Sequence, residues 1–216
     1  MNKPVFPKKM NNSHETIIDL LRHGEPDGGE LVFRGRTDDA LTSKGWQQMN
    51  NTIGDHRHWD TIISSPALRC AEFSKKLSER LSVPLKQNEQ LWELDLGEWD
   101  GKLFTEIQKD DPDLFTRFLQ DPVKVTPPAG ESLPNFQQRI LQTWDSLYQE
   151  NKGKHLLVIA HGGPIRIIIG HVLGIPLDSL LKLELPYAGI SRIRIYSDDN
   201  HTTPVSSLVF HVGALS

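Results

Sequence analysis

The sequence predicts an α/β fold, a three-layer α/β/α sandwich in which a twisted, mainly parallel sheet lies between helices on both faces. Two apolar segments, 16–21 and 155–160, each run directly into a histidine followed by a glycine. This arrangement is typical of buried strands that end in functional loops. The length of 216 residues suits one large domain, because a chain of this size can bury a substantial core.

The first half of the chain alternates predicted strands and helices. Thr42 can cap a helix that Gly54 closes, since a threonine side chain satisfies free N–H groups and glycine suits the C-terminal turn. Segment 60–65 reads as a second strand. Pro66 then opens a helix expected over 67–81, with its apolar residues on one side.

The second half continues the pattern and adds a hairpin. The apolar spacing predicts a helix over 132–148, the strand over 155–160 and a helix over 164–173. Segments 190–197 and 206–212 alternate in polarity on either side of the turn DDNHTTP. These two segments are therefore expected to form two antiparallel strands.

The middle of the chain, about 83–133, carries a weaker regular signal. It contains a short extended piece near Leu85, two predicted helices at 103–109 and 112–119, and the proline-rich loop DPVKVTPPAG. An insertion of this kind is suited to covering a site. We therefore expect a single domain over 16–216 with a lid at 83–133, preceded by a disordered extension at 1–15.

Composition narrows the class of protein. The formal net charge is −4, which argues against nucleic acid as a partner because such domains are usually basic. The most apolar stretch is short for a membrane span and contains Arg166 and His171. The first fifteen residues lack the apolar run of a secretory signal. The lone Cys70 is expected to be a small buried residue in a reducing compartment, so we predict a cytoplasmic protein.

Three strand ends carry the residues that suggest chemistry. His23 and His161 follow the two most apolar segments, and Arg69 lies in the first turn of the helix after segment 60–65. Ligands of parallel sheets bind at the carboxyl ends of the strands, and helix N-termini attract anions. Singly, each residue is equally well a structural or solvated side chain. Together they predict a positive pocket for an anion of phosphate size.

The motifs LLRHGE, RGRTDDALTSKGWQQM, ISSPALRC, LWELDLGEWDG, GES and VIAHGGPIR occur in this order. The combination resembles the histidine phosphatase superfamily, also called the phosphoglycerate mutase-like family. The resemblance implies that His23 is the nucleophile, that Arg22 and Arg69 clamp the phosphate, and that His161 donates to it. These roles suit the residues, because imidazole is nucleophilic near neutral pH and a guanidinium fork matches two phosphate oxygens.

The same resemblance assigns two further positions. Gly162 is expected beside the phosphate, and Glu93 takes the place of the proton donor that an alkoxide leaving group requires. Asp95, Glu98 and Asp100 are competing carboxylates, with Asp95 the main rival, and any one of the three could instead be a solvated loop acid or a helix cap. Covalent phosphoryl transfer to histidine needs no metal and no other cofactor, so we expect activity to survive a chelator.

One departure from the family pattern concerns the loop after RHGE. Many members carry a phosphate-binding asparagine there, whereas this chain has residues 26–29 in the sequence PDGG. Arg34 or Arg36 could supply the missing phosphate contact, and either is equally well a surface charge.

The stretch LDLGEWDG resembles the phosphatase branch, in particular the α-ribazole phosphatases. The expected function is therefore a phosphomonoesterase acting on a small phosphorylated metabolite, α-ribazole 5′-phosphate of cobalamin biosynthesis. Rivals are a broad-specificity metabolite or sugar phosphatase, a phosphoglycerate mutase and a non-catalytic phospho-ligand-binding protein. Whether the protein is a monomer or a homodimer stays open. Five aromatic residues either line a pocket for an aromatic base or pack in the core: Phe33, Trp99, Phe104, Phe115 and Phe118.

Overall fold

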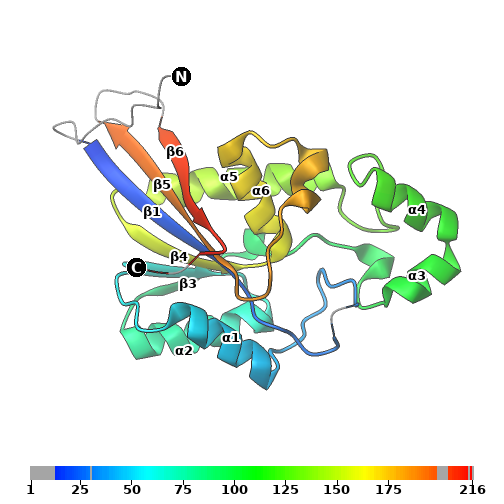
Figure 1. Cartoon of the computed structure of the whole chain (residues 1–216), viewed down its shortest axis with the longest axis horizontal. Coiled ribbons are helices and arrows are strands. Elements are labelled where there is room, and N and C mark those ends of the chain that lie inside the picture. The colour runs from blue at the N-terminus through cyan, green and yellow to red at the C-terminus, as the bar shows by residue number, and fades with distance from the viewer. Residues whose placement is uncertain (1–12, 30, 199–203, 214, 216) are drawn as a thin grey trace.

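The computed structural model describes residues 13–29, 31–198, 204–213 and 215. One six-stranded sheet runs through them in the order β3-β2-β4-β1-β5-β6 (Figure 1). The strands are β1 (Ser13–Arg22), β2 (Thr61–Ser64), β3 (Leu85–Gln87), β4 (His155–Ala160), β5 (Ile190–Asp198) and β6 (Val205–His211). The first four strands pair in parallel, and β5 and β6 add an antiparallel edge. The predicted mainly parallel sheet is confirmed.

Helices cover both faces of the sheet, as the sandwich prediction requires (Figure 1). On one face lie α1 (Ser43–Ile53) and α2 (Leu68–Leu81), and on the other α5 (Leu133–Glu150) and α6 (Gly162–Leu173). Alternation along β1 explains the two layers, because successive side chains of a strand point to opposite faces. Ile18 and Leu20 pack with α5 and α6, whereas Leu21 packs with α1 and α2.

Predicted caps set several helix ends. The Thr42 hydroxyl accepts from the Gly45 N–H at 2.9 Å, and Gly54 closes α1 in a positive-φ conformation. Ser132 caps α5 by accepting from the Asn135 N–H. Each cap satisfies an N–H that the helix itself leaves without a partner, so sequence signals and observed ends agree.

The strand β1 begins earlier than the sequence indicated. It starts at Ser13, which pairs with Asp198 of β5, so residues 13–15 are strand rather than disordered extension. The segment is polar and therefore shows no apolar strand pattern, and its backbone pairs with β5. Residues 1–12, predicted to be disordered, and 199–203, within the predicted turn, lie outside the described residues.

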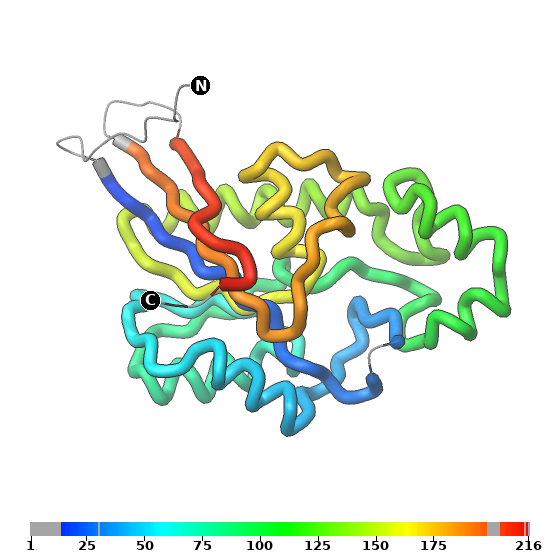
Figure 2. The backbone as a smooth tube through the Cα atoms, viewed as in Figure 1, coloured from blue at the N-terminus to red at the C-terminus, as the bar shows by residue number. Residues whose placement is uncertain are grey.

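The middle segment protrudes from the sheet beyond α5 and α6 (Figure 2). It contains η1 (Glu89–Leu91), η2 (Gly97–Trp99), α3 (Phe104–Asp110) and α4 (Pro112–Gln120), and the later η3 (Leu177–Lys182) follows α6. The segment has a small apolar core of its own: Leu96, Trp99, Ile107, Phe115 and Phe118. An isolated bridge between Val32 and Leu103 ties this segment to the loop after β1.

Candidate active site

The carboxyl ends of β1 and β4 bring the two predicted histidines together. His23 follows β1, His161 follows β4, and their ring centroids lie 5.2 Å apart in an edge-on arrangement. Both side chains are buried. The expectation that the two strand ends share one crevice therefore agrees with the positions of these rings.

The nucleophile candidate His23 is held in one tautomer. Its Nδ1 lies 2.8 Å from the Gly24 carbonyl oxygen, and because a carbonyl can only accept, Nδ1 carries the proton. Nε2 is then left with its lone pair. Burial, reinforced by the charges of Arg69 and Arg22, holds the pKa of His23 well below its usual value of 6.5, so the ring is neutral at physiological pH.

Arg22 is the last residue of β1 and points its guanidinium into the same region. Its Nη1 donates to the Leu185 carbonyl at 2.5 Å, and the guanidinium lies 4.2 Å from the ring centroid of Tyr187. Its Nε is buried and has no partner among the described residues. A buried donor without a partner costs free energy, so Arg22 is prepared to bind an acceptor.

Arg69 is fully buried in the first turn of α2. It donates from Nη1 to the Thr37 carbonyl at 2.6 Å and from Nη2 to the Gly35 carbonyl at 3.0 Å. Its Nε donates to Nδ1 of His161 at 3.2 Å. The loop after β1 thus fixes the orientation of this guanidinium, and two of its five N–H groups remain for a ligand.

His161 is held on both sides. Because the Arg69 Nε can only donate, Nδ1 of His161 is the acceptor, and the neutral ring carries its proton on Nε2. That nitrogen lies 2.8 Å from the Ser65 hydroxyl. Burial and the neighbouring Arg69 charge hold the pKa of His161 well below 6.5. Sequence reasoning missed Ser65, although its place between strand β2 and helix α2 was a usable signal.

Glu93 lies at the N-terminus of α6, where the helix dipole favours negative charge. Its Oε2 accepts from the Gly163 N–H at 3.0 Å and its Oε1 from the Leu94 N–H at 3.0 Å. The approach needs glycine, because a Cβ on Gly163 would lie 2.1 Å from Oε1 of Glu93. A Cβ on Gly162 would likewise lie 2.7 Å from Nη1 of Arg166.

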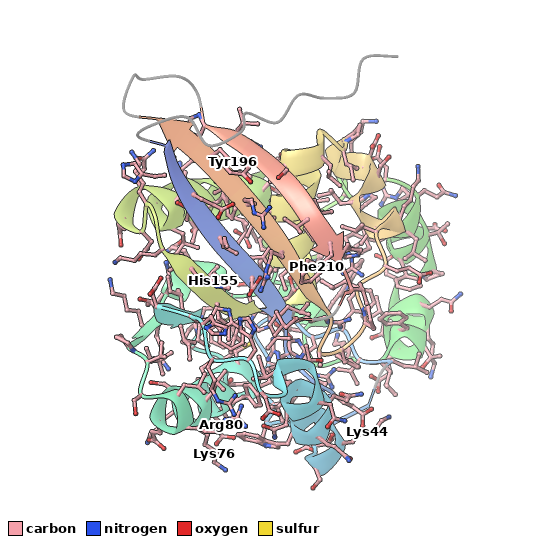
Figure 3. All side chains as sticks on the ribbon, turned by 60° about the vertical axis from the view of Figure 1, so that its left-hand side comes forward. Lys44, Lys76, Arg80, His155, Tyr196 and Phe210 are labelled. Carbon is pink, nitrogen blue, oxygen red and sulfur yellow. The ribbon has the colours of Figure 1, made fainter. Side chains whose placement is uncertain are left out.

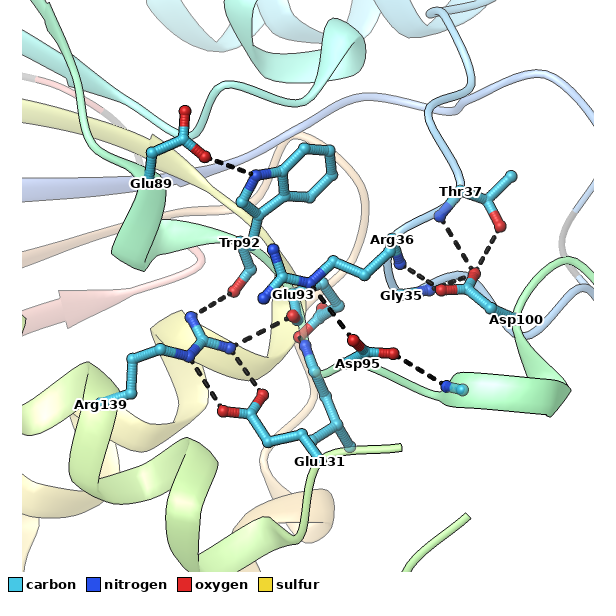
Figure 4. Close-up of polar contacts among 12 residues, drawn as sticks. Gly35, Arg36, Thr37, Glu89, Trp92, Glu93, Asp95, Asp100, Glu131 and Arg139 are labelled. Atoms are coloured by element: carbon cyan, nitrogen blue, oxygen red, sulfur yellow. Dashed lines mark hydrogen bonds and ion pairs between the residues drawn. The ribbon is translucent and has the colours of Figure 1, made fainter. Parts of the chain in front are cut away.

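A half-buried ion pair supports the segment that carries Glu93 (Figure 4). Arg139 of α5 donates to both carboxylate oxygens of Glu131, at 3.0 and 2.7 Å, and to the carbonyls of Gln90 and Trp92. Glu131 belongs to the GES motif, whose role the sequence did not reveal. Its pairing with Arg139 fixes the backbone on which the candidate acid stands.

The other charged candidates make contacts within the protein, and Arg34 also lines the cavity beside Glu93. Arg34 donates to Asp39 at 2.6 Å and to two carbonyls of its own loop, so its phosphate contact stays a prediction. Arg36 lies over the Trp92 ring, 5.3 Å from its centroid. Asp95, the rival acid, accepts from the Gly97 N–H at 2.9 Å and does not line the cavity beside Glu93.

A cavity of about 390 Å³ opens beside Glu93, within the range of small-molecule sites. Its lining is mostly apolar and includes Phe33, Phe104 and Phe118. Trp99 and Phe115, predicted as alternatives for pocket or core, pack in the core of the middle segment. The cavity wall also includes Arg166, whose Nε donates to the Leu183 carbonyl at 2.9 Å; sequence reasoning did not single it out as a site residue.

Chemically, the site combines two imidazoles, two guanidinium groups and a carboxylate. Burial lowers the pKa of the Arg22 guanidinium overall, but Glu93 is near enough for its charge to raise this pKa. Guanidinium groups stabilise the negative charge on the oxygens of a phosphoryl group in transfer, and a carboxyl group can exchange a proton with the leaving oxygen. The arrangement is suited to moving a phosphoryl group onto nitrogen and off again.

Comparisons with known proteins agree with this geometry. The solved structure of YhfR from Bacillus stearothermophilus superposes with a TM-score of 0.79 at 28% identity, covering 93% of this chain and 98% of that one. The fold is that of phosphoglycerate mutase-like proteins. The family model of the histidine phosphatase superfamily (branch 1) matches residues 18–206. The chain belongs to this superfamily.

Curated relatives span several described activities. A putative phosphoserine phosphatase 2 of Hydrogenobacter thermophilus is 31% identical over 82% of this chain and 88% of its own. The adenosylcobalamin/alpha-ribazole phosphatase of Escherichia coli is 22% identical over 82% of this chain and 88% of its own. A bifunctional protein of Mycobacterium tuberculosis is 30% identical, and the chain spans 51% of its length. Among helices of the described residues, none has the length and hydropathy needed to cross a membrane.

Proposed function

We propose that this protein hydrolyses phosphomonoesters through a phosphohistidine formed on Nε2 of His23. The observation that carries the proposal is the 2.8 Å contact between Nδ1 of His23 and the Gly24 carbonyl. That contact places the ring proton on Nδ1 and leaves the lone pair of Nε2 for attack on phosphorus.

In the first step, Nε2 of His23 forms a bond to phosphorus while the ester P–O bond breaks. Glu93 in its protonated form gives a proton to the departing oxygen, so the leaving group departs as an alcohol. Arg22 and Arg69 stabilise the charge on the non-bridging oxygens. His161 carries its proton on Nε2, and it donates this proton in a hydrogen bond to a phosphoryl oxygen, which competes with the Ser65 hydroxyl.

In the second step, water attacks the phosphohistidine and the P–N bond breaks. The Glu93 carboxylate accepts a proton from the attacking water, which restores the acid for the next cycle. Inorganic phosphate leaves, and His23 returns to its neutral tautomer. The cycle consumes one water and needs no metal.

For the substrate we propose α-ribazole 5′-phosphate. The apolar cavity beside Glu93, with Phe33, Phe104 and Phe118 in its wall, suits a flat aromatic base on the leaving group. The Escherichia coli relative supports this choice through its described activity. The relative described as a phosphoserine phosphatase makes phosphoserine the second candidate.

The test is steady-state hydrolysis of four esters in the presence of EDTA: α-ribazole 5′-phosphate, phosphoserine, 3-phosphoglycerate and p-nitrophenyl phosphate. His23→Ala is the inactive variant, and His171→Ala, at an exposed position near the end of α6, is the matched control. We expect α-ribazole 5′-phosphate to have the highest kcat/KM, with all turnover lost only in His23→Ala.

Other outcomes separate the parts of this proposal. A preference for phosphoserine would keep the mechanism and replace the substrate. Interconversion of phosphoglycerates without release of phosphate would indicate a mutase. Phosphate binding without turnover of any ester would indicate a non-catalytic binding protein, and full activity in His23→Ala would overturn the mechanism.

A further inference from the structure

The carboxylate of Asp100 binds a whole turn of the loop that follows β1 (Figure 4). Its Oδ1 accepts from the N–H of Gly35 at 3.0 Å and of Thr37 at 3.1 Å. Its Oδ2 accepts from the N–H of Arg36, and the Thr37 hydroxyl also donates to Oδ1. A half-buried carboxylate with four donors is a strong anchor, because charge-assisted hydrogen bonds exceed neutral ones in strength.

The same turn of the loop holds Arg69 from its other side. The carbonyls of Gly35 and Thr37 accept from Nη2 and Nη1 of Arg69. The N–H groups of these two residues therefore bind Asp100 while their carbonyls bind Arg69. A displacement of this turn would move both acceptors of the guanidinium at once.

The contacts continue from Arg69 to His161 through the 3.2 Å hydrogen bond to Nδ1. Asp100 is not among the residues that line the cavity, and its hydrogen bonds go to residues 35–37. It belongs to the middle segment, which is further tied to the loop by hydrogen bonds between Phe33 and residues 101–102. Asp100 thus connects the segment that covers the cavity with the phosphate-binding side of the site.

We propose that Asp100 is a positioning residue that sets the orientation of Arg69, and through it of His161, toward the phosphoryl group. The proposal rests on the proposed function for the role of these two residues. The plain alternative is a loop carboxylate that only stabilises the fold. Four donors from three consecutive residues, all bordering the two acceptors of one guanidinium, favour positioning.

The test compares Asp100→Asn with Asp113→Asn, an exposed carboxylate of the same segment in the first turn of α4. Asparagine keeps the shape of the aspartate side chain, but its NH2 group replaces one oxygen and cannot accept from the N–H donors that this oxygen binds. Two quantities are measured: the Kd of inorganic phosphate by calorimetry and kcat/KM for p-nitrophenyl phosphate. We expect Asp100→Asn to weaken phosphate binding and to lower kcat/KM by roughly 10- to 100-fold, as misplaced catalytic groups do, while Asp113→Asn changes both by less than about 3-fold.

A double-mutant cycle with Arg69→Gln separates positioning from stability. If Asp100 acts through Arg69, Asp100→Asn has little further effect on kcat/KM in the Arg69→Gln background. An equal loss in both backgrounds, or no loss in the single variant, overturns the proposal. Thr37→Val removes one of the four donors and replaces Asp100→Asn in the test if that variant does not fold. An unchanged phosphate Kd in Thr37→Val also contradicts the proposal. Phosphate binding needs no turnover, so this test stands even if the proposed hydrolysis fails.

Discussion

Two buried charged clusters lie on β1, three residues apart, and they are built in opposite ways. Asp19 is fully buried, and both of its oxygens are occupied. Arg192 donates at 2.7 and 3.0 Å, Trp59 at 2.8 Å, and Nε2 of His155 lies 2.8 Å away. Figure 3 labels His155 on its strand. This cluster is complete within the protein.

The cluster around His23 lacks a matching anion. Arg22 has a buried Nε without a partner among the described residues, and Arg69 faces carbonyls and an imidazole rather than a carboxylate. Glu93 is the acid of this region, and it is held by backbone N–H groups. Uncompensated buried positive charge costs free energy, so the cluster around His23 should gain stability when an anion binds. This difference separates a structural network from a binding site.

Judged only by the distances between possible ligand atoms, the Asp19 cluster would be the binding site. Asp19, His56 and His155 have ligand atoms within 4.8 Å of one another and could hold a metal ion by that criterion. The carboxylate of Asp19, however, already accepts from Arg192 and Trp59. Because these donors already occupy the Asp19 oxygens, the cluster has a structural role.

The largest expected effect comes from breaking the complete cluster. Asp19→Asn leaves the Arg192 guanidinium buried without its counter-charge, and we expect a loss of about 3–5 kcal/mol in the free energy of unfolding. Activity at a temperature where the variant is folded should stay within about 2-fold of the wild type. Urea unfolding and kcat/KM on the same sample measure both. A stable but inactive variant would show that Asp19 belongs to the active site.

Arg22→Lys probes the incomplete cluster. Lysine keeps the charge but loses the planar fork, so we expect kcat/KM to fall roughly 100- to 1,000-fold, as on removal of a preorganised donor. Its free energy of unfolding should change by less than about 1 kcal/mol, because the buried Nε that lysine lacks has no partner among the described residues and the lysine ammonium can still donate to the Leu185 carbonyl. A large loss of stability with normal kinetics would reverse the assignment of the two clusters.

Glu93→Gln separates proton donation from phosphate binding. We expect kcat/KM to fall about 100-fold for an alkyl phosphate. The loss should be much smaller for p-nitrophenyl phosphate, whose leaving group needs no proton. Equal losses for both esters would remove Glu93 from the role of acid, and Asp95→Asn, run beside it, tests the rival assignment.

The two clusters should also respond to pH in separate ranges. The pKa values of His23 and His161 are depressed by burial and by neighbouring guanidinium groups. The folded state therefore binds fewer protons than the unfolded chain, and stability falls as pH drops below about 6.5. Burial would raise the pKa of Asp19, but hydrogen bonds from His155, Arg192 and Trp59 lower it overall.

The Asp19 contribution is present above pH 3.8 and is lost as pH falls through the lower folded pKa. Asp19→Asn should therefore keep the stability slope between pH 7 and 5 and show a smaller slope below about pH 4. Chemical denaturation across this range measures both slopes. If the upper slope disappears in Asp19→Asn, the separation of the clusters is contradicted.

The fold was predictable because local signals and tertiary packing agreed. Segment 155–160 is apolar throughout and became the buried central strand β4, and Thr42 caps α1 as its position indicated. Residues 13–15 were predicted as disordered extension because this polar start of β1 has no apolar pattern. Their strand depends on hydrogen bonds to β5, almost two hundred residues later.

The site was predictable in its residue types but not in its supports. His23 and His161 stand out through glycines after apolar strands, and the family motifs place Arg22, Arg69 and Glu93. The motifs contain several of the supporting residues, such as Gly24 in RHGE, Ser65 in ISSPALRC and Glu131 in GES, but they do not show what each contacts. The contact between Glu131 and Arg139 forms only when α5 packs against the middle segment. Arg34 stays a predicted phosphate ligand: it lines the cavity, and its guanidinium also donates to Asp39 and to carbonyls of its own loop.

The most direct test of the account is to trap the phosphorylated enzyme. The protein is mixed with a rapidly hydrolysed ester, quenched in alkali to preserve a phosphorus–nitrogen bond, and analysed by peptide mass spectrometry. We predict one phosphoryl group on His23, absent in His23→Ala and accumulating when Glu93→Gln slows attack by water. A phosphoryl group on another residue, or turnover with no phosphorylated His23 at any time, would contradict the central claim.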